Sequence, residues 1–274
     1  MIVLLFAGAI AYAPAQWLNQ RDVRIPRTKD GKPNLSAPAP HTSNGKPDLS
    51  GIWETDRTPR PEMERMFPFL GGFDVPGDDP LTFNKYLFNI MSDFKPEDDP
   101  IRPEFVPLMR QRSRNQKDTP TTLCLPLGIP QVHALPEPYK IVQTPGLTLM
   151  IYEGEPTRQI FTDGRKHASD PDPSWLGYSV GNWEKDTLVV DTVGFNDRTW
   201  LDAFGHPHSE SLHVVERFHR RDFGHMDLQV TFEDLKVYTK PVTVNYTQTL
   251  LPDTDLLEYV CTENERSRAH LPNP

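Results

Sequence analysis

Five of the nine histidines lie between His206 and His225, which makes this stretch the first candidate for chemistry. Imidazole is both a metal ligand and a proton carrier near neutral pH. In an extended chain His206 and His208 lie on one side about 7 Å apart, with Glu210 next on that side. Two nitrogens and a carboxylate form the ligand set of several catalytic metal sites. The spacing therefore predicts zinc or another transition metal as the cofactor, if the protein is an enzyme.

The same loop carries carboxylates and aromatic residues. Asp197, Asp202 and Glu210 flank the two histidines and could act as general acid or base. Alternatively, these carboxylates cap turns or pair with neighbours such as Arg198. Pockets for small molecules mix aromatic surface with a few polar groups, as this loop does. The ligand-binding residues predicted in the loop are Phe195, Asn196, Arg198, Trp200 and Phe204.

Two functions from different classes fit this loop. The first is a binding protein that holds a small organic ligand at residues 194–210. The second is a metal-assisted hydrolase, lyase or isomerase that uses His206 and His208 with a nearby carboxylate. Neither a nucleophile elbow nor a phosphate-binding loop occurs in the sequence. We favour the binding protein, because no motif here is as specific as an established catalytic signature.

The elements that must position this loop are strands. From Tyr139 onward apolar residues recur with a period of two, and links of two to five residues join most of the runs. This pattern predicts a mainly β fold, an antiparallel meander closed as a lipocalin-like barrel, with a β-sandwich as the alternative. The nine predicted strands span residues 139–144, 147–153, 158–162, 178–183, 187–193, 212–220, 225–233, 242–250 and 256–261.

One hairpin allows a register to be predicted. The apolar residues of 212–220 and 225–233 must share the core face, so the position numbers of paired residues must have an even sum. Pairing His219 with His225 meets this condition and places Arg217 opposite Asp227. The other face is then polar throughout, which is typical of the solvated outer surface of an antiparallel sheet. That face carries His213, Arg217, His219, His225, Asp227, Gln229 and Glu233.

Proline separates the chain into two parts, because 20 of the 29 prolines precede residue 139. Residues 51–138 are therefore predicted to form a proline-rich region with short helices near 81–94 and 104–115, before a β domain at 139–274. Residues 16–50 are predicted to be an extended basic arm. An imperfect repeat of 14 residues, 30–37 against 44–51, brings turn-forming Asp-Gly and Asn-Gly steps into this arm.

The chain begins like an exported protein. Residues 1–15 are predicted to be a signal peptide, because the apolar run is too short to span a bilayer and ends at Ala13-Pro14-Ala15; an uncleaved anchor is the alternative. The protein is thus expected to be periplasmic or secreted, without a transmembrane segment. In such a compartment the only two cysteines, Cys124 and Cys261, are predicted to form a disulfide, with two buried thiols as the alternative.

Charge restricts the partners. The net charge is −9, and the arm from Gln16 to Lys46 is basic, so the remainder of the chain is strongly acidic. An acidic body argues against binding of nucleic acid. The expected partner is a small-molecule ligand or substrate.

Several strings resemble a family of exported proteins from soil bacteria, abundant in Acidobacteria. They include GKPDLSGIW at 45–53, IVQTPG at 141–146, RQIFTDGR at 158–165, GYSVG at 177–181, DTLVV at 186–190 and GFND at 194–197. The resemblance extends from about residue 45 to the end. It implies export and a bacterial source, and it transfers no catalytic residue. The absence of a basic stretch at the start of the chain departs from the pattern.

Overall fold

The computed structural model describes residues 21–68 and 83–261. The predicted signal peptide lies outside these residues. Within them, no helix combines the length and the apolar composition needed to cross a membrane.

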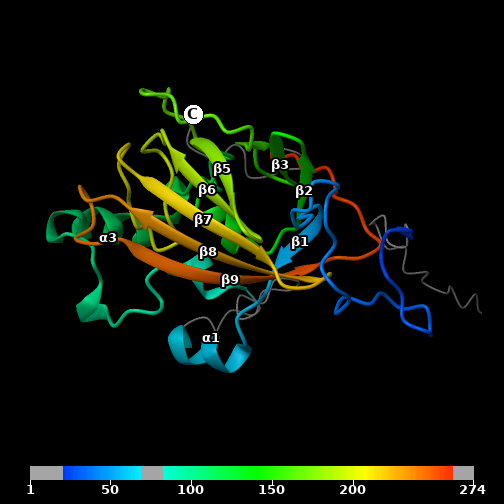
Figure 1. The fold of residues 1–274 in the computed structure, drawn as a ribbon. Coiled ribbons are helices and arrows are strands. Elements are labelled where there is room, and N and C mark those ends of the chain that lie inside the picture. Colours follow the sequence, from blue (N-terminus) through cyan, green and yellow to red (C-terminus); the bar gives the residue numbers. More distant parts are fainter. Residues whose placement is uncertain (1–20, 69–82, 262–274) are drawn as a thin grey trace, which may run out of the picture.

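Nine strands form a closed barrel in chain order, in which each strand pairs with the next and β9 closes against β1 (Figure 1). This closure confirms the mainly β, lipocalin-like barrel and excludes the sandwich. The strands are β1 Gly51–Thr55, β2 Tyr139–Thr144, β3 Leu147–Tyr152, β4 Arg158–Phe161, β5 Tyr178–Glu184, β6 Thr187–Val193, β7 His213–Arg220, β8 His225–Glu233 and β9 Val242–Leu250.

The closing strand is β1, and the prediction of a strand at 256–261 was wrong. β1 pairs with both β2 and β9, and its Trp53 is fully buried in the core. Residues 256–261 make no strand. They are held instead by a hydrogen bond from Leu257 N to Glu153 Oε1 (2.8 Å) and by the Cys261 disulfide. The barrel thus takes one strand from the region predicted to be proline-rich with short helices.

One strand pair departs from the predicted antiparallel meander. β4 and β5 run parallel, with Ile160 opposite Ser179 and Phe161 opposite Val180. The connection 162–177 returns the chain to the end of the barrel where β4 began, because parallel neighbours need a crossover rather than a hairpin.

The hairpin of β7 and β8 has the predicted faces but a different register. His219 pairs with Asp227 and Arg217 with Gln229, two residues away from the predicted pairing. The Asp222 carboxylate accepts hydrogen bonds from Gly224 N (3.0 Å) and His225 N (2.8 Å), which closes the turn between the two strands. A shift of two residues leaves every side chain on its predicted face. The polar face lies on the outside, half-buried or exposed, as predicted.

The arm docks against one end of the barrel, shown in blue in Figure 1. The repeat is structural: Thr28 N donates to Lys32 O and Thr42 N to Lys46 O, so each copy forms the same turn. The glycine in each turn has a positive φ, which a residue without a side chain adopts at low cost. Backbone hydrogen bonds from residues 223 and 224 to residues 37 and 35 attach the arm to the β7–β8 turn. We name this end the arm end.

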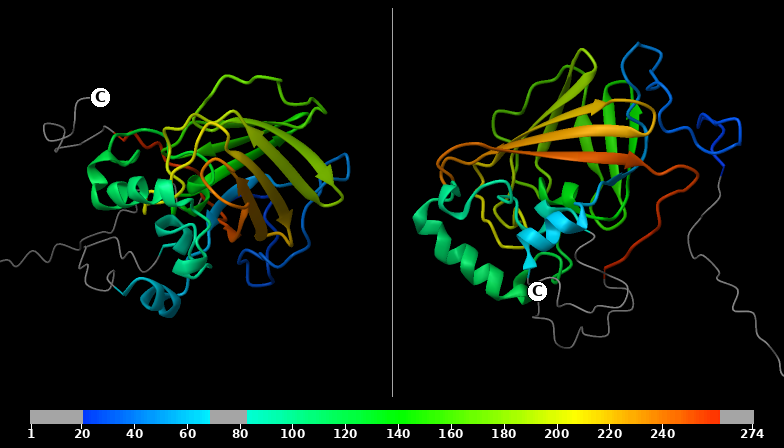
Figure 2. Two further views of the ribbon diagram at one scale, coloured as in Figure 1. Left: turned by 90° about the vertical axis from the view of Figure 1, so that its left-hand side faces the viewer. Right: turned by 90° about the horizontal axis from the view of Figure 1, so that it is seen from below.

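Short helices cover the opposite side of the molecule, in both views of Figure 2. The predicted helices near 81–94 and 104–115 correspond to the short α2 and to α3, while residues 81–82 lie outside the described residues. η6 is buried, and Thr55 Oγ1 donates to the carbonyl of His133 (2.7 Å), which fixes η6 in the barrel opening. The helices are α1 Arg60–Met66, α2 Lys85–Phe88, α3 Val106–Arg114 and the 3-10 helices η3 Pro96–Asp98, η4 Pro103–Phe105, η5 Gln116–Asp118 and η6 Gln131–Ala134.

Candidate functional site

His206, in the loop between β6 and β7, is held between two carboxylates. Its Nδ1 lies 2.5 Å from Asp202 Oδ2, and its Nε2 lies 3.4 Å from Asp99 Oδ2. Burial by itself would lower the pKa of His206, but the charges and hydrogen bonds of Asp202 and Asp99 outweigh burial and raise this pKa to about 9. The imidazole is therefore a buried cation at neutral pH.

His208 has a separate set of partners. Its Nε2 lies 2.6 Å from Thr199 Oγ1 and its Nδ1 lies 3.1 Å from the carbonyl of Ser209. Burial lowers the pKa of His208, so this imidazole is neutral. Glu210 is exposed on the surface.

The two predicted zinc ligands have separate partners in this structure. A metal ion binds deprotonated imidazole nitrogens, and both nitrogens of His206 face carboxylates here. Among residues 21–68 and 83–261, no group of three or more His, Cys, Asp or Glu side chains is arranged to hold a metal ion.

The other predicted loop residues mainly anchor the loop. Asn196 Oδ1 accepts a hydrogen bond from Arg198 N (3.1 Å), and the Arg198 guanidinium lies 4.6 Å from the centre of the Trp175 ring. Asp197 is exposed. The carboxylate of Asp202 is buried and accepts a hydrogen bond from Ile90 N (2.7 Å), joining the loop to the region after α2. The predicted aromatic residues pack: Phe195 and Trp200 are buried, and Phe204 lies edge-on to Phe67.

Two of the predicted residues border a groove. His206 and Phe204 line an open groove of about 530 Å³ together with Asp99, Lys95 and Arg110. Both ring nitrogens of His206 already have a carboxylate as hydrogen-bond partner, so the side chain has little capacity to hydrogen-bond a ligand in the groove.

The buried cation of His206 leads to a prediction on pH. A histidine whose pKa is higher in the folded state than in the unfolded state stabilises the fold. This stabilisation is fully present below the unfolded-state pKa and is lost as pH rises through the folded-state pKa. At pH 6 we expect wild type to have a higher free energy of unfolding than His206→Gln. This difference between the two proteins should decrease by on the order of 3 kcal/mol between pH 6 and pH 10. Urea denaturation at several pH values measures this. The exposed His219→Gln is the control; a difference independent of pH would contradict the assignment.

The barrel interior contains a charged cluster that the sequence analysis did not identify. Arg158 Nη1 donates to Glu216 Oε1 (2.8 Å), its Nη2 donates to the other oxygen, and His133 Nε2 lies 2.7 Å from Glu216 Oε1. The side chains of all three are almost completely inaccessible. Burial raises the pKa of Glu216, but Arg158 and His133 outweigh burial and lower this pKa to about 2. The even position of Glu216 in β7 was the signal that could have placed it inside.

Large side chains fill the space around this cluster. Phe218 and Tyr246 are fully buried inside the barrel, and their ring centres lie 6.1 and 6.2 Å from that of the His133 ring. The barrel interior around this cluster is thus a packed core.

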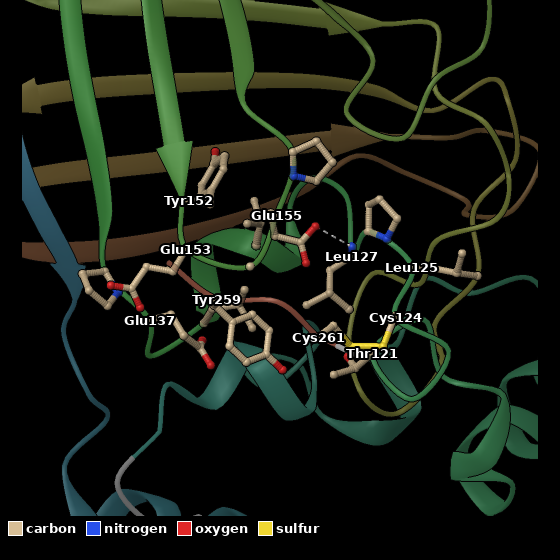
Figure 3. Close-up of a pocket in the computed structure, with 16 residues that line it drawn as sticks. Thr121, Cys124, Leu125, Leu127, Glu137, Tyr152, Glu153, Glu155, Tyr259 and Cys261 are labelled. Atoms are coloured by element: carbon tan, nitrogen blue, oxygen red, sulfur yellow. Dashed lines mark hydrogen bonds between the residues drawn. A yellow bond between two sulfur atoms is a disulfide. The ribbon is translucent and has the colours of Figure 1, made fainter. Parts of the chain in front are cut away.

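A pocket lies where η6 meets the turn between β3 and β4. This pocket of about 390 Å³ opens between three segments, residues 121–127, residues 153–156 and residues 256–261, which contain Tyr259 and Cys261 (Figure 3). We name it the Glu155 pocket. Residues 256–261 are called the tail below. Its walls are mainly apolar, with Leu125, Leu127, Val132, Leu135 and Tyr152 among the lining residues.

One carboxylate in the pocket, that of Glu155, has a raised pKa. Glu155 Oε2 accepts a hydrogen bond from Leu127 N (3.0 Å), as Figure 3 shows. Burial raises the pKa of Glu155 to about 7, and the charge of nearby Glu137 adds to the shift. Titratable groups with shifted pKa values in a concave site are typical of functional sites. No motif marks Glu155 in the sequence, so sequence reasoning missed it.

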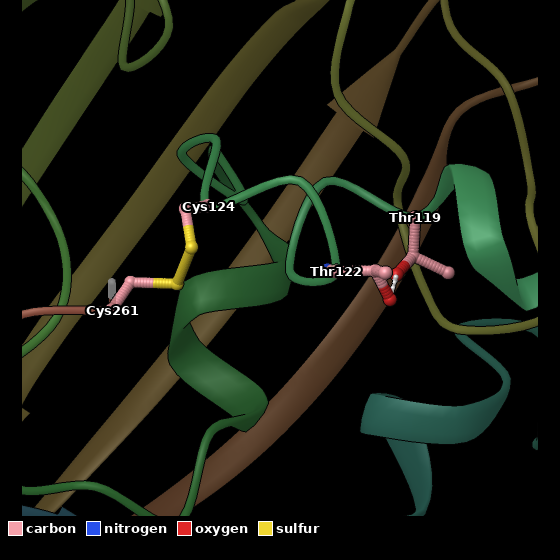
Figure 4. The surroundings of a disulfide bond; sticks show 4 residues. All are labelled: Thr119, Thr122, Cys124 and Cys261. Atoms are coloured by element: carbon pink, nitrogen blue, oxygen red, sulfur yellow. Dashed lines mark hydrogen bonds between the residues drawn. A yellow bond between two sulfur atoms is a disulfide. The ribbon is translucent and has the colours of Figure 1, made fainter. Parts of the chain in front are cut away.

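The predicted disulfide is confirmed, and it forms part of this pocket. Cys124 and Cys261 are bonded, with Cα atoms 5.7 Å apart (Figure 4). Thr119 Oγ1 donates to Thr122 Oγ1 (2.8 Å) in the turn just before Cys124. The bond fixes the tail as one wall of the pocket, because both cysteines line the cavity.

Comparison with known proteins gives no match to a family model, a curated protein or a solved structure. Function must therefore be inferred from the chemistry of the site, since a barrel alone is compatible with many functions.

Proposed function

We propose that this protein is an exported small-molecule-binding protein that holds its ligand in the Glu155 pocket, and not in the 194–210 loop. The observation that carries the proposal is the pocket itself: about 390 Å³, with mostly apolar walls and a few polar groups. These properties are typical of sites for small organic molecules, which measure roughly 300 to 1,000 Å³.

The disulfide supports the export part of the proposal. Disulfides persist in oxidising compartments such as the periplasm and the extracellular space, and are rare in the cytosol. The Cys124–Cys261 bond has a role in the folded protein, since it holds a wall of the pocket.

Binding is favoured over the metal-assisted reaction for a structural reason. The enzyme hypothesis depended on His206 and His208 sharing an ion, and their nitrogens have different partners. Among the described residues that line the Glu155 pocket there is neither a histidine nor an activated nucleophile.

Filling the pocket tests the proposal. Leu127 lines the cavity, and Leu127→Trp would extend an indole into it. We expect wild type to bind the neutral apolar dye N-phenyl-1-naphthylamine, and Leu127→Trp to bind it at least tenfold more weakly, as measured by dye fluorescence. The control is Leu235→Trp, at an exposed position in the connection between β8 and β9.

The control separates a pocket from nonspecific adsorption. Both variants should melt within a few degrees of wild type. A wild type that does not bind the dye, or two variants that bind it as tightly as wild type, would contradict the proposed site.

A further inference from the structure

Among the residues that the structure describes, all the charged side chains that line the Glu155 pocket are acidic. Glu137, Glu153 and Glu155 belong to this lining, whereas no lysine, arginine or histidine of residues 21–68 and 83–261 does. The three come from two segments, one just before β2 and one just after β3. A pocket with a charge of one sign attracts ligands of the opposite sign, and low-dielectric walls strengthen that attraction.

Glu155 has capacity for a further partner. Leu127 N is the only hydrogen-bond donor that reaches its carboxylate among the described residues. A carboxylate has about four acceptor positions on its two oxygens. An ammonium group would supply the missing donors together with the compensating charge, and charge-assisted hydrogen bonds of this type are the strong ones.

Aromatic rings complete the lining. Tyr152 is buried at the end of β3, and Tyr259 lies across the pocket in the tail, with 59% of its surface exposed. The face of an aromatic ring attracts cations and also packs against an apolar body. Aromatic faces beside carboxylates are suited to organic ammonium groups.

We propose that the ligand of the Glu155 pocket is an organic cation, an amine on an aromatic or aliphatic body, whose ammonium group pairs with Glu155. The inference rests on the proposed function, because it specifies the ligand class for the same pocket. The apolar walls would receive the body, and the three glutamates disfavour a ligand that carries a carboxylate or phosphate.

The pairing should depend on pH. Glu155 must be ionised to bind a cation, and its pKa is about 7 because of burial and the charge of Glu137. In the part of the chain that the structure describes, the other ionisable groups that line the pocket are Glu153, Tyr152 and Tyr259. The affinity for an amine is therefore expected to fall as pH decreases from 8 to 6, while the amine itself stays protonated.

Three probes of nearly equal shape test the inference. Calorimetry at pH 8 would compare 1-naphthylmethylamine, 1-naphthalenemethanol and 1-naphthoate. We expect the amine to bind at least tenfold more tightly than the alcohol, and the naphthoate to bind most weakly. Glu155→Gln should reduce amine affinity about tenfold, leave alcohol affinity within a factor of two, and abolish the fall between pH 8 and pH 6.

The control is Glu184→Gln, which removes an exposed carboxylate paired with Arg217 on the outside of the barrel. It should leave amine affinity unchanged. Equal binding of amine and alcohol by wild type, or an amine preference that Glu155→Gln retains, would overturn the cation inference while the pocket remains a binding site. If none of these probes nor the naphthylamine dye binds, the proposed function itself is overturned.

Discussion

Replacing Glu216 by leucine is expected to lower the free energy of unfolding by about 3 to 5 kcal/mol. Arg158 and Glu216 have side chains that are 1% and 0% exposed, so the variant would leave the guanidinium charged and buried without its counter-ion. His133 would also lose the carboxylate that its Nε2 contacts at 2.7 Å. Urea denaturation at pH 7 measures the loss.

The matched control is the double variant Arg158→Met with Glu216→Leu. Replacing a whole buried ion pair by apolar groups of similar volume costs much less than removing one partner. The double variant should therefore be more stable than Glu216→Leu alone, although His133 still lacks a partner. A loss below about 1 kcal/mol for the single variant would show that the cluster is not the buried ion pair described above.

Removing the disulfide should have a comparable effect. On the chain-entropy model, a bond between residues 137 apart stabilises a protein by on the order of 4 to 5 kcal/mol, because it restricts the unfolded chain. We expect Cys124→Ser with Cys261→Ser to lose about this amount. The variant should also bind the naphthylamine dye more weakly, since Tyr259 and Cys261 form a wall of the pocket.

Denaturation and dye binding should be measured on the same preparations. Reduction of wild type should reproduce both effects, whereas reductant should leave the serine variant unchanged. If the variant is as stable as wild type but still loses the dye, the tail detaches from the body as an independent unit. If neither property changes, the disulfide supports neither the fold nor the site.

Local periodicity in the sequence determined most of the barrel. Alternating apolar residues predicted eight of the nine strands to within two residues and placed the side chains of β7 and β8 on the correct faces. Successive side chains of a strand point to opposite sides, so this information is contained in neighbouring residues. The number of cysteines was sufficient to predict the disulfide, because only one pairing exists within the chain.

The closure of the barrel and the register of its hairpin were decided by the tertiary structure. Gly51–Thr55 is a short strand in a proline-rich part of the chain, and it becomes one because the edges of β2 and β9 supply its hydrogen-bond partners. The β7–β8 register depended on the turn that Asp222 closes. The closure and the register both depend on which of several similar strand pairings gives the best packing of the side chains.

The candidate site was also decided by the tertiary structure. The histidines that are close in sequence separate in space: His213, His219 and His225 lie on the outer surface, while His206 is buried between Asp202 and Asp99. Conversely, Leu127 and Glu155 are far apart in sequence and meet in one pocket. Residue types and spacings specify local geometry, whereas a pocket arises where packed segments leave a space, and that depends on the path of the whole chain.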